Sequence, residues 1–302
     1  MRALLPLVAC VCLTACGDSS STPRNETGGS GGASGSAGIG GKAGAAGGCQ
    51  PAPGEPSGLP ERCVQEVRGG VFAAPSAPLG DLPVTLCGVA CFAGKSGADG
   101  RYAVEVGAFL PEGGYVVFAH GRPGHASAFV RLPSAPPEVA DVGDVELPPL
   151  ASSGVFLPPD SGAGGPVTVG RLTLQVEPGT VWELDLEDTL LEKAGRELRA
   201  TEVQAERAPE FAKGSLAVMA LGPFQATPSK PVGVVFELAS PLPPGTQVEL
   251  LVMDDGILSN ANTGGKPRVD AVGKVSSDGK RVQTNTGEGL RVLTWLALRT
   301  KP

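Results

Sequence analysis

The sequence predicts an all-β protein in which two tandem antiparallel β-sandwiches follow a disordered glycine-rich linker. The 302 residues include 45 glycines and 29 prolines but only 4% aromatic residues, a composition that suits short strands and many turns. Apolar residues alternate with a period of two within residues 64–150, and residues 151–302 contain apolar, β-branched runs. Turn sequences, among them Asp-Gly pairs, separate these segments. The length allows one large domain or two ordinary ones.

The first sandwich is expected within residues 49–150. Leu82, Val84 and Leu86 fall on one face of the segment LPVTL, and RYAVEV alternates in the same way. In YVVFAH, the face with Tyr115, Val117 and Ala119 lies opposite the face with Val116, Phe118 and His120. Asp99-Gly100 is a hairpin signal between two of these segments. Such short alternating segments with turns between them are typical of a small antiparallel sandwich.

The second sandwich is expected within residues 151–302. Its strands are predicted from the apolar segments VTVGRLTLQV, SLAVMALG, PVGVVFEL and QVELLVM, and from the residues around the Asp278-Gly279 turn. Apolar positions between residues 184 and 198 could share one helical face, so at most one short helix is expected there. The alternation in RELRATEVQA favours a strand in the second half of that region.

Residues 1–15 have the pattern of a secretory signal peptide. Arg2 supplies the positive charge, and the apolar stretch of about eleven residues that follows is too short to span a bilayer as a helix. Leu13-Thr14-Ala15-Cys16 resembles the bacterial lipobox. That resemblance implies cleavage before Cys16 and attachment of a diacylglyceryl thioether and an N-acyl chain, which would anchor the chain to a membrane. The alternative is an ordinary signal peptide with Cys16 unmodified.

Residues 16–48 are predicted to form the lipidated cysteine and a disordered tether. Glycine, serine and alanine dominate this stretch, and it offers too few apolar side chains to form a core. A glycine-rich coil of this length has a root-mean-square span of about 30 Å. Gly17, rather than aspartate, follows Cys16, which in the lipoprotein family favours the outer membrane.

Four cysteines follow the tether, and in an exported protein an even number predicts two disulfides. We favour the pairs Cys49–Cys63 and Cys87–Cys91, although the sequence allows three connectivities. A four-cysteine zinc site is the alternative, but the spacings differ from the paired Cys-x₂-Cys of zinc ribbons.

Residues 64–148 resemble a carboxypeptidase regulatory-like domain, through VRGGVFAAPSAPLGDLPVTL, SGADGRYAVEV, YVVFAHG and DVGDVEL. The resemblance implies a transthyretin-like seven-stranded sandwich that serves as a spacer or binding module and has no catalytic residues. Some relatives carry an internal Lys–Asn isopeptide bond. This segment has Lys95 but no asparagine, so that bond cannot form within it.

The C-terminal part resembles, more weakly, the β-sandwich domain of ankyrins and netrin receptors. PFQATPSKPVGVVFEL and the hairpin segment DGKRVQTNTGEGL carry this resemblance over about 130 residues. It implies a domain that mediates contacts.

Candidate metal ligands are few. His120 and His125 lie in a glycine-rich segment and could offer two ligands, but a solvated turn is the simpler interpretation. Asp254-Asp255-Gly256 could contribute to a calcium site, although it lacks the spaced ligands of an EF-hand and fits a hairpin turn. We therefore predict no metal and no cofactor.

Candidate catalytic groups are equally sparse. Asp185, Glu187 and Asp188 could form an acid pair, but an acidic surface patch is the simpler interpretation. Ser127 lies beside His125 without a nucleophile-elbow motif or an evident third triad member. The two tryptophans, Trp182 and Trp295, are expected in the core or at its rim.

These patterns favour a lipid-anchored, non-enzymatic protein of the bacterial cell envelope that displays β-sandwiches for structural or adhesive contacts. A protein or carbohydrate at the cell surface is a possible partner class. The formal charge of −7 argues against nucleic acid and against binding to anionic lipid through a basic patch. The alternatives are an envelope hydrolase or carbohydrate-active enzyme built from distant carboxylates, and a periplasmic module that binds a small ligand between its domains.

Overall fold

The computed structural model describes residues 48–52, 58–73, 75–121, 123–157, 162–191, 193–253 and 266–301. The predicted leader, Cys16 and almost all of the tether lie outside these residues. The described part belongs to one compact unit and is built from strands with a single five-residue α-helix, which confirms the all-β prediction. No helix in the described ranges is both long and apolar enough to cross a membrane.

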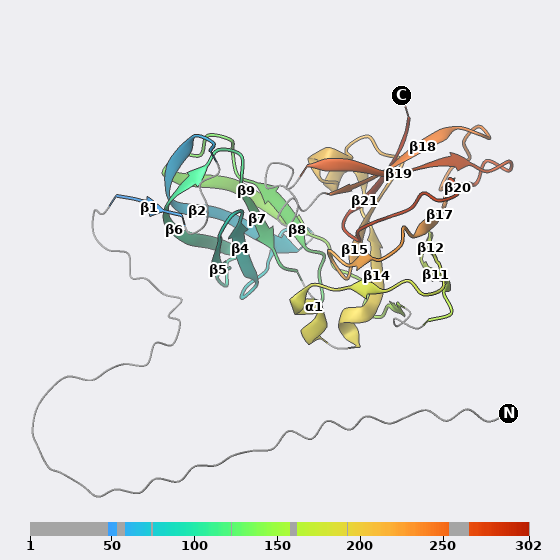
Figure 1. Ribbon diagram of the computed structural model, residues 1–302, viewed down its shortest axis with the longest axis horizontal. Helices are drawn as coiled ribbons and strands as arrows, with labels where there is room; N and C mark the ends of the chain where they lie inside the picture. Colours follow the sequence, from blue (N-terminus) through green and yellow to red (C-terminus); the bar gives the residue numbers. More distant parts are fainter. Residues whose placement is uncertain are drawn as a thin grey trace, which may run out of the picture. The chain divides into compact units, whose positions relative to one another are not determined.

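The N-terminal half is a sandwich of two sheets (Figure 1). One sheet has the order β1-β6-β2-β3, and β9 also pairs with β2. The other has the order β5-β4-β7-β8. The strands of the first sheet are β1 (Gln50–Pro51), β2 (Glu61–Ala73), β3 (Ala77–Pro78), β6 (Arg101–Pro111) and β9 (Val139–Leu147). Those of the second are β4 (Pro83–Cys87), β5 (Cys91–Lys95), β7 (Val116–Ala119) and β8 (Ala128–Arg131).

Two strand pairs in this half are parallel, a detail that differs from the purely antiparallel expectation. β1 runs parallel to β6, and β9 runs parallel to β2. Parallel neighbours need a crossover connection rather than a hairpin. The chain makes that crossover after β8, when it leaves the four-stranded sheet and joins β2 in the other layer.

The core of this sandwich lies where the alternation predicted it. Val84, Leu86 and Val104 are fully buried between the two sheets, together with the inward side chains of β2, which are Val64, Val67 and Val71. The Asp99-Gly100 turn joins β5 to β6, and Gly100 adopts a φ of 76°, a left-handed conformation that favours glycine.

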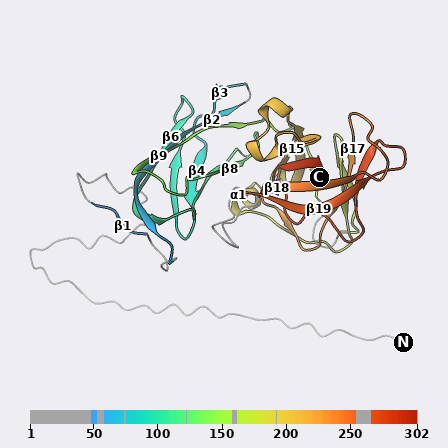
Figure 2. The same ribbon diagram turned by 90° about the horizontal axis from the view of Figure 1, so that it is seen from above.

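The C-terminal half is dominated by one ten-stranded sheet in the order β10-β14-β15-β21-β18-β19-β20-β17-β12-β11. The end strands β10 and β11 contact each other, so the sheet folds back around a core of its own (Figures 1 and 2). Its strands, in chain order, are β10 (Val155–Phe156), β11 (Gly165–Val169), β12 (Leu172–Val176), β14 (Glu197–Glu202), β15 (Ala217–Gly222), β17 (Gly233–Glu237), β18 (Gln247–Met253), β19 (Pro267–Val275), β20 (Arg281–Thr284) and β21 (Leu296–Thr300).

Shorter elements complete this half. β13 (Trp182–Glu183) pairs with β16 (Thr227–Pro228). The expected short helix is α1 (Leu186–Leu190), and the strand expected after it is β14. Three 3-10 turns lie at residues 194–196, 205–207 and 210–212.

A third apolar cluster joins the two halves. It contains residues from β7 and β8 of the first half and from β15, β18 and β21 of the second. Phe118 in β7 stacks on Phe224 with ring centroids 5.5 Å apart, and Phe129 lies 5.3 Å from Phe224. The indole N–H of Trp295 donates a hydrogen bond of 2.8 Å to the carbonyl oxygen of Ser127.

Strand β7 is buried on both of its faces. Val117 and Ala119 point into the N-terminal core, whereas Val116 and Phe118 belong to the cluster between the halves. A strand covered on both faces needs a continuous apolar run instead of an alternating one. The segment YVVFA has that pattern, so its sequence already carries the signal for double burial.

Phe118→Ala should lower the free energy of unfolding by about 3–5 kcal/mol, the usual cost of emptying a buried phenylalanine site. Phe118 is only 4% exposed. Phe109→Ala is the matched control, because Phe109 is 37% exposed and its truncation should cost about 0.5–1 kcal/mol. Urea unfolding followed by the fluorescence of the two tryptophans measures both. Equal losses in the two variants would contradict the packing described here.

Candidate functional site

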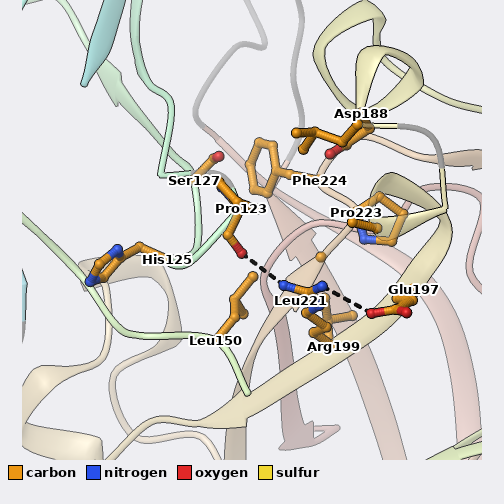
Figure 3. Close-up of a pocket in the computed structure, with 13 residues that line it drawn as sticks. Pro123, His125, Ser127, Leu150, Asp188, Glu197, Arg199, Leu221, Pro223 and Phe224 are labelled. Atoms are coloured by element: carbon orange, nitrogen blue, oxygen red, sulfur yellow. Dashed lines mark hydrogen bonds and ion pairs between the residues drawn. The ribbon is translucent and has the colours of Figure 1, made fainter. Parts of the chain in front are cut away.

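Three residues singled out in the sequence, His125, Ser127 and Asp188, line one pocket between the two halves (Figure 3). His125 and Ser127 come from the segment between β7 and β8, and Asp188 comes from α1. The other lining residues are Pro123, Leu150, Leu191, Ala194, Glu197, Arg199, Leu221, Gly222, Pro223 and Phe224. We treat this pocket as the candidate site.

Arg199 is the central charged group of the pocket. Its Nη2 donates to Glu197 Oε2 at 2.9 Å, and its Nη1 donates to the carbonyl oxygen of Pro123 at 3.2 Å (Figure 3). The hydrogen bond from Arg199 lowers the pKa of Glu197, because it favours the ionised carboxylate. Arg199 therefore links β14 of the C-terminal half to the β7–β8 segment of the N-terminal half.

The pocket is too small for an organic substrate. Its volume is about 20 Å³, whereas sites for small organic ligands usually measure about 300–1,000 Å³. A volume of this size accommodates about one water molecule. The Nε atom of Arg199 is buried and has no hydrogen-bond partner in the described structure, so a water at this point would find a donor.

The Ser127 hydroxyl does not face His125. Ser127 is 1% exposed, and its Oγ accepts a hydrogen bond of 3.1 Å from the backbone N–H of Gly121. The His125 imidazole points away from the Ser127 side chain (Figure 3). A nucleophilic serine needs its base within hydrogen-bond reach. Ser127 instead fixes the turn after β7 and supplies the acceptor for Trp295.

The two histidines are not brought together as a metal site. His120 is buried, its Nε2 lies 3.1 Å from the Thr85 hydroxyl, and its ring centroid lies 3.7 Å from that of Phe118. Among the described residues, no group of three His, Cys, Asp or Glu side chains could hold a metal ion. His120 is part of the apolar packing around β7.

The acidic candidates near α1 differ in their exposure to solvent. Asp188 is buried beside the pocket, and Asp185 is half-buried, with its backbone carbonyl accepting from Thr189 N at 2.9 Å. The side chain of Glu187 and the whole of Asp254-Asp255-Gly256 lie outside the described residues.

Both disulfides favoured by the sequence are present in the structure. Cys49 is bonded to Cys63 with Cα atoms 5.5 Å apart, and Cys87 is bonded to Cys91 with Cα atoms 4.2 Å apart. The amide nitrogen of Gln65 lies 3.3 Å and 3.4 Å from the sulfurs of Cys49 and Cys63. The second disulfide closes the hairpin between β4 and β5.

Two wider hollows are both lined in part by Arg207 and Glu146, which form an ion pair. One, of about 250 Å³, is lined by Pro148, Pro149 and Val203 beside this pair. The other, of about 380 Å³, is open and includes Phe72 and Pro75. Because the pair joins β9 to the 3-10 turn at residues 205–207, it is a further polar link between the halves.

No local sequence pattern marks the polar groups that hold this junction and the second sheet together. Arg199, Arg207 and Glu146 do not belong to any recognisable sequence motif. Asp270 is a further example: its buried carboxylate accepts from the backbone N–H of Arg291 at 2.6 Å and from Arg268 at 3.1 Å. A buried carboxylate is tolerated when it is paired and hydrogen-bonded in this way. Only the fold brings these residues together.

Comparisons with known proteins leave the chain without an assigned family. No family model matches it, and no curated protein matches it. Among solved structures it is similar to the Bacillus anthracis TIE protein, with 9% identity and a TM-score of 0.23. The match covers 79% of this chain and 31% of that one, so the chain spans about a third of the length of this relative.

His125 should titrate below its usual range, because burial disfavours the charged imidazolium and lowers the pKa of this side chain. As the pH falls, the His125 imidazole is therefore protonated at a higher pH in the unfolded chain than in the folded protein. Stability contributed by His125 is complete above the unfolded pKa of about 6.5 and is lost as the pH falls below it. NMR titration of the imidazole measures the pKa, and a midpoint above 6.5 would contradict the expectation.

The lowered pKa of His125 should also make the free energy of unfolding depend on pH. Between pH 7.5 and pH 5.5 the wild-type protein should lose more unfolding free energy than His125→Asn, which has no imidazole to protonate. Carboxylates titrate in both proteins, so the difference between the two profiles isolates His125.

Proposed function

We propose that the chain is a lipid-anchored, non-enzymatic protein of the bacterial cell envelope that presents its β-sandwich body for structural or adhesive contacts. The observation that carries this proposal is Leu13-Thr14-Ala15-Cys16, which follows a short apolar leader and precedes a glycine-rich segment. We assign the anchor to the thiol of Cys16, with the outer membrane as its location because Gly17 follows it. The partner would be a protein or carbohydrate at the cell surface.

The two disulfides support export. Disulfides persist in oxidising compartments and are rare in the cytosol. Both join cysteines that are close in sequence, and both lie in the N-terminal half, which is the first part of the body after the tether. A chain that leaves the cytoplasm behind a signal peptide would meet the conditions in which these bonds form.

The candidate site supports a role in contacts over one in catalysis. Arg199 bonds to Glu197 and to the Pro123 carbonyl on the other side of the junction, and the pocket's volume suits a single water. Ser127 and His125 do not form a nucleophile and base pair. The resemblance of residues 64–148 to a carboxypeptidase regulatory-like domain points the same way, since that family supplies spacer and binding modules.

A rigid β-sandwich usually presents binding residues on loops and sheet edges. The acyl chains that we assign to Cys16 would hold the body at the membrane, because two or three buried chains make attachment close to permanent. The glycine-rich segment between them would let the body reach its partner over a span of about 30 Å.

Metabolic labelling with a fatty-acid analogue tests the anchor in a bacterium that expresses the full chain. The wild-type protein should be labelled and should sediment with the envelope, whereas Cys16→Ala should be unlabelled because it lacks the thiol to be alkylated. Cys12→Ala, which changes a cysteine within the leader, is the matched control and should keep the label. Equal labelling of wild type and Cys16→Ala would end the proposal.

A further inference from the structure

The point at which the tether meets the folded body is the Cys49–Cys63 disulfide. Cys49 follows the last glycine of the linker and is nearly buried, while Cys63 lies in β2. We infer that this disulfide is a mechanical clasp, which passes a pull on the tether directly into β2. This inference rests on the proposed function, because only a tethered body carries such a load.

Without the bond, the N-terminal end of the body has a weak hold on the sheet. β1 is two residues long and pairs with β6 only at Gln50 and Pro51. Both residues are exposed, and Pro51 has no N–H with which to extend the ladder. A pull on residue 48 would therefore detach β1 at low force and draw out the chain up to β2.

The strand that receives the load through the bond is the best-supported strand of its sheet. β2 pairs with β6 along one edge from residue 61 to residue 70, and with β9 along the other from residue 66 to residue 73. Val64, Val67 and Val71 anchor it in the N-terminal core with no exposed surface. Pulling β2 out would break two ladders and open the core together.

The order of the strands lets the Cys49–Cys63 disulfide carry a pull from β1 to β2 without passing through β6. β6 lies between β1 and β2, yet the Cα atoms of Cys49 and Cys63 are 5.5 Å apart, so the disulfide bypasses β6. The side chain of Gln65, two residues further along β2, lies against both sulfurs. The load thus enters the sheet at Cys63, beyond the short terminal strand.

Single-molecule pulling tests the clasp on the chain from Cys16 to Pro302, held by the thiol of Cys16 and by a tag at the C-terminus. In Cys49→Ser/Cys63→Ser, a step below the main unfolding force should release about 40 Å, since fourteen residues at about 3.4 Å each replace a separation of 5.5 Å. The oxidised wild-type protein should lack this step.

Cys87→Ser/Cys91→Ser is the matched control. It removes the other disulfide, which closes a hairpin inside the fold and lies off the path from the tether to β2. This variant should unfold without the early step. If the Cys49→Ser/Cys63→Ser protein does not fold, the folded control variant is treated with a thiol reductant on the instrument, and the early step should then appear.

The inference fails if the extra length appears only within the main unfolding event at the wild-type force, because β1 would then hold without the bond. The handles do not use a lipid. A missing early step therefore overturns the clasp alone, and equal fatty-acid labelling of Cys16→Ala overturns the anchor alone.

Discussion

Packing of the outer face of β7 against the outer faces of β15, β18 and β21 is the contact on which the rest of the structure depends. Each of these strands has apolar side chains on both faces, one set in the core of its own half and the other in the shared cluster. Separating the halves would expose Phe118, Phe224 and Trp295 to water. Apolar burial of this kind is the main favourable term in protein association.

The polar contacts at the junction depend on that packing. Arg199 reaches the Pro123 carbonyl, Thr201 donates to the Pro149 carbonyl at 2.7 Å, and Arg207 pairs with Glu146. Each of these contacts adds little to the free energy of unfolding on its own, because ion pairs near a surface contribute about 0–1 kcal/mol. They satisfy backbone carbonyls and fix the orientation of the halves. The sequence candidates His125, Ser127 and Asp188 line a pocket at the same junction, where Ser127 and Asp188 are buried and His125 is half-buried.

Local sequence patterns predicted the strands well and the junction poorly. Alternation placed Val84, Leu86 and Val104 in a core, and cysteine spacing favoured both disulfides. The parallel pairing of β9 with β2 follows from a crossover between sheets, which period-two patterning does not encode. The junction could have been suspected from the unbroken apolar runs YVVFA and AVMAL, since an alternating strand needs only one buried face. Its ion pair between Arg207 and Glu146 joins residues 61 positions apart and leaves no local signal.

Differential scanning calorimetry of residues 49–302 tests most directly whether the two halves form one body. Shared burial of both faces of β7 predicts a single transition in which the calorimetric and van't Hoff enthalpies agree. Two separate transitions, or a calorimetric enthalpy about twice the van't Hoff value, would show that the halves unfold independently and would contradict the account.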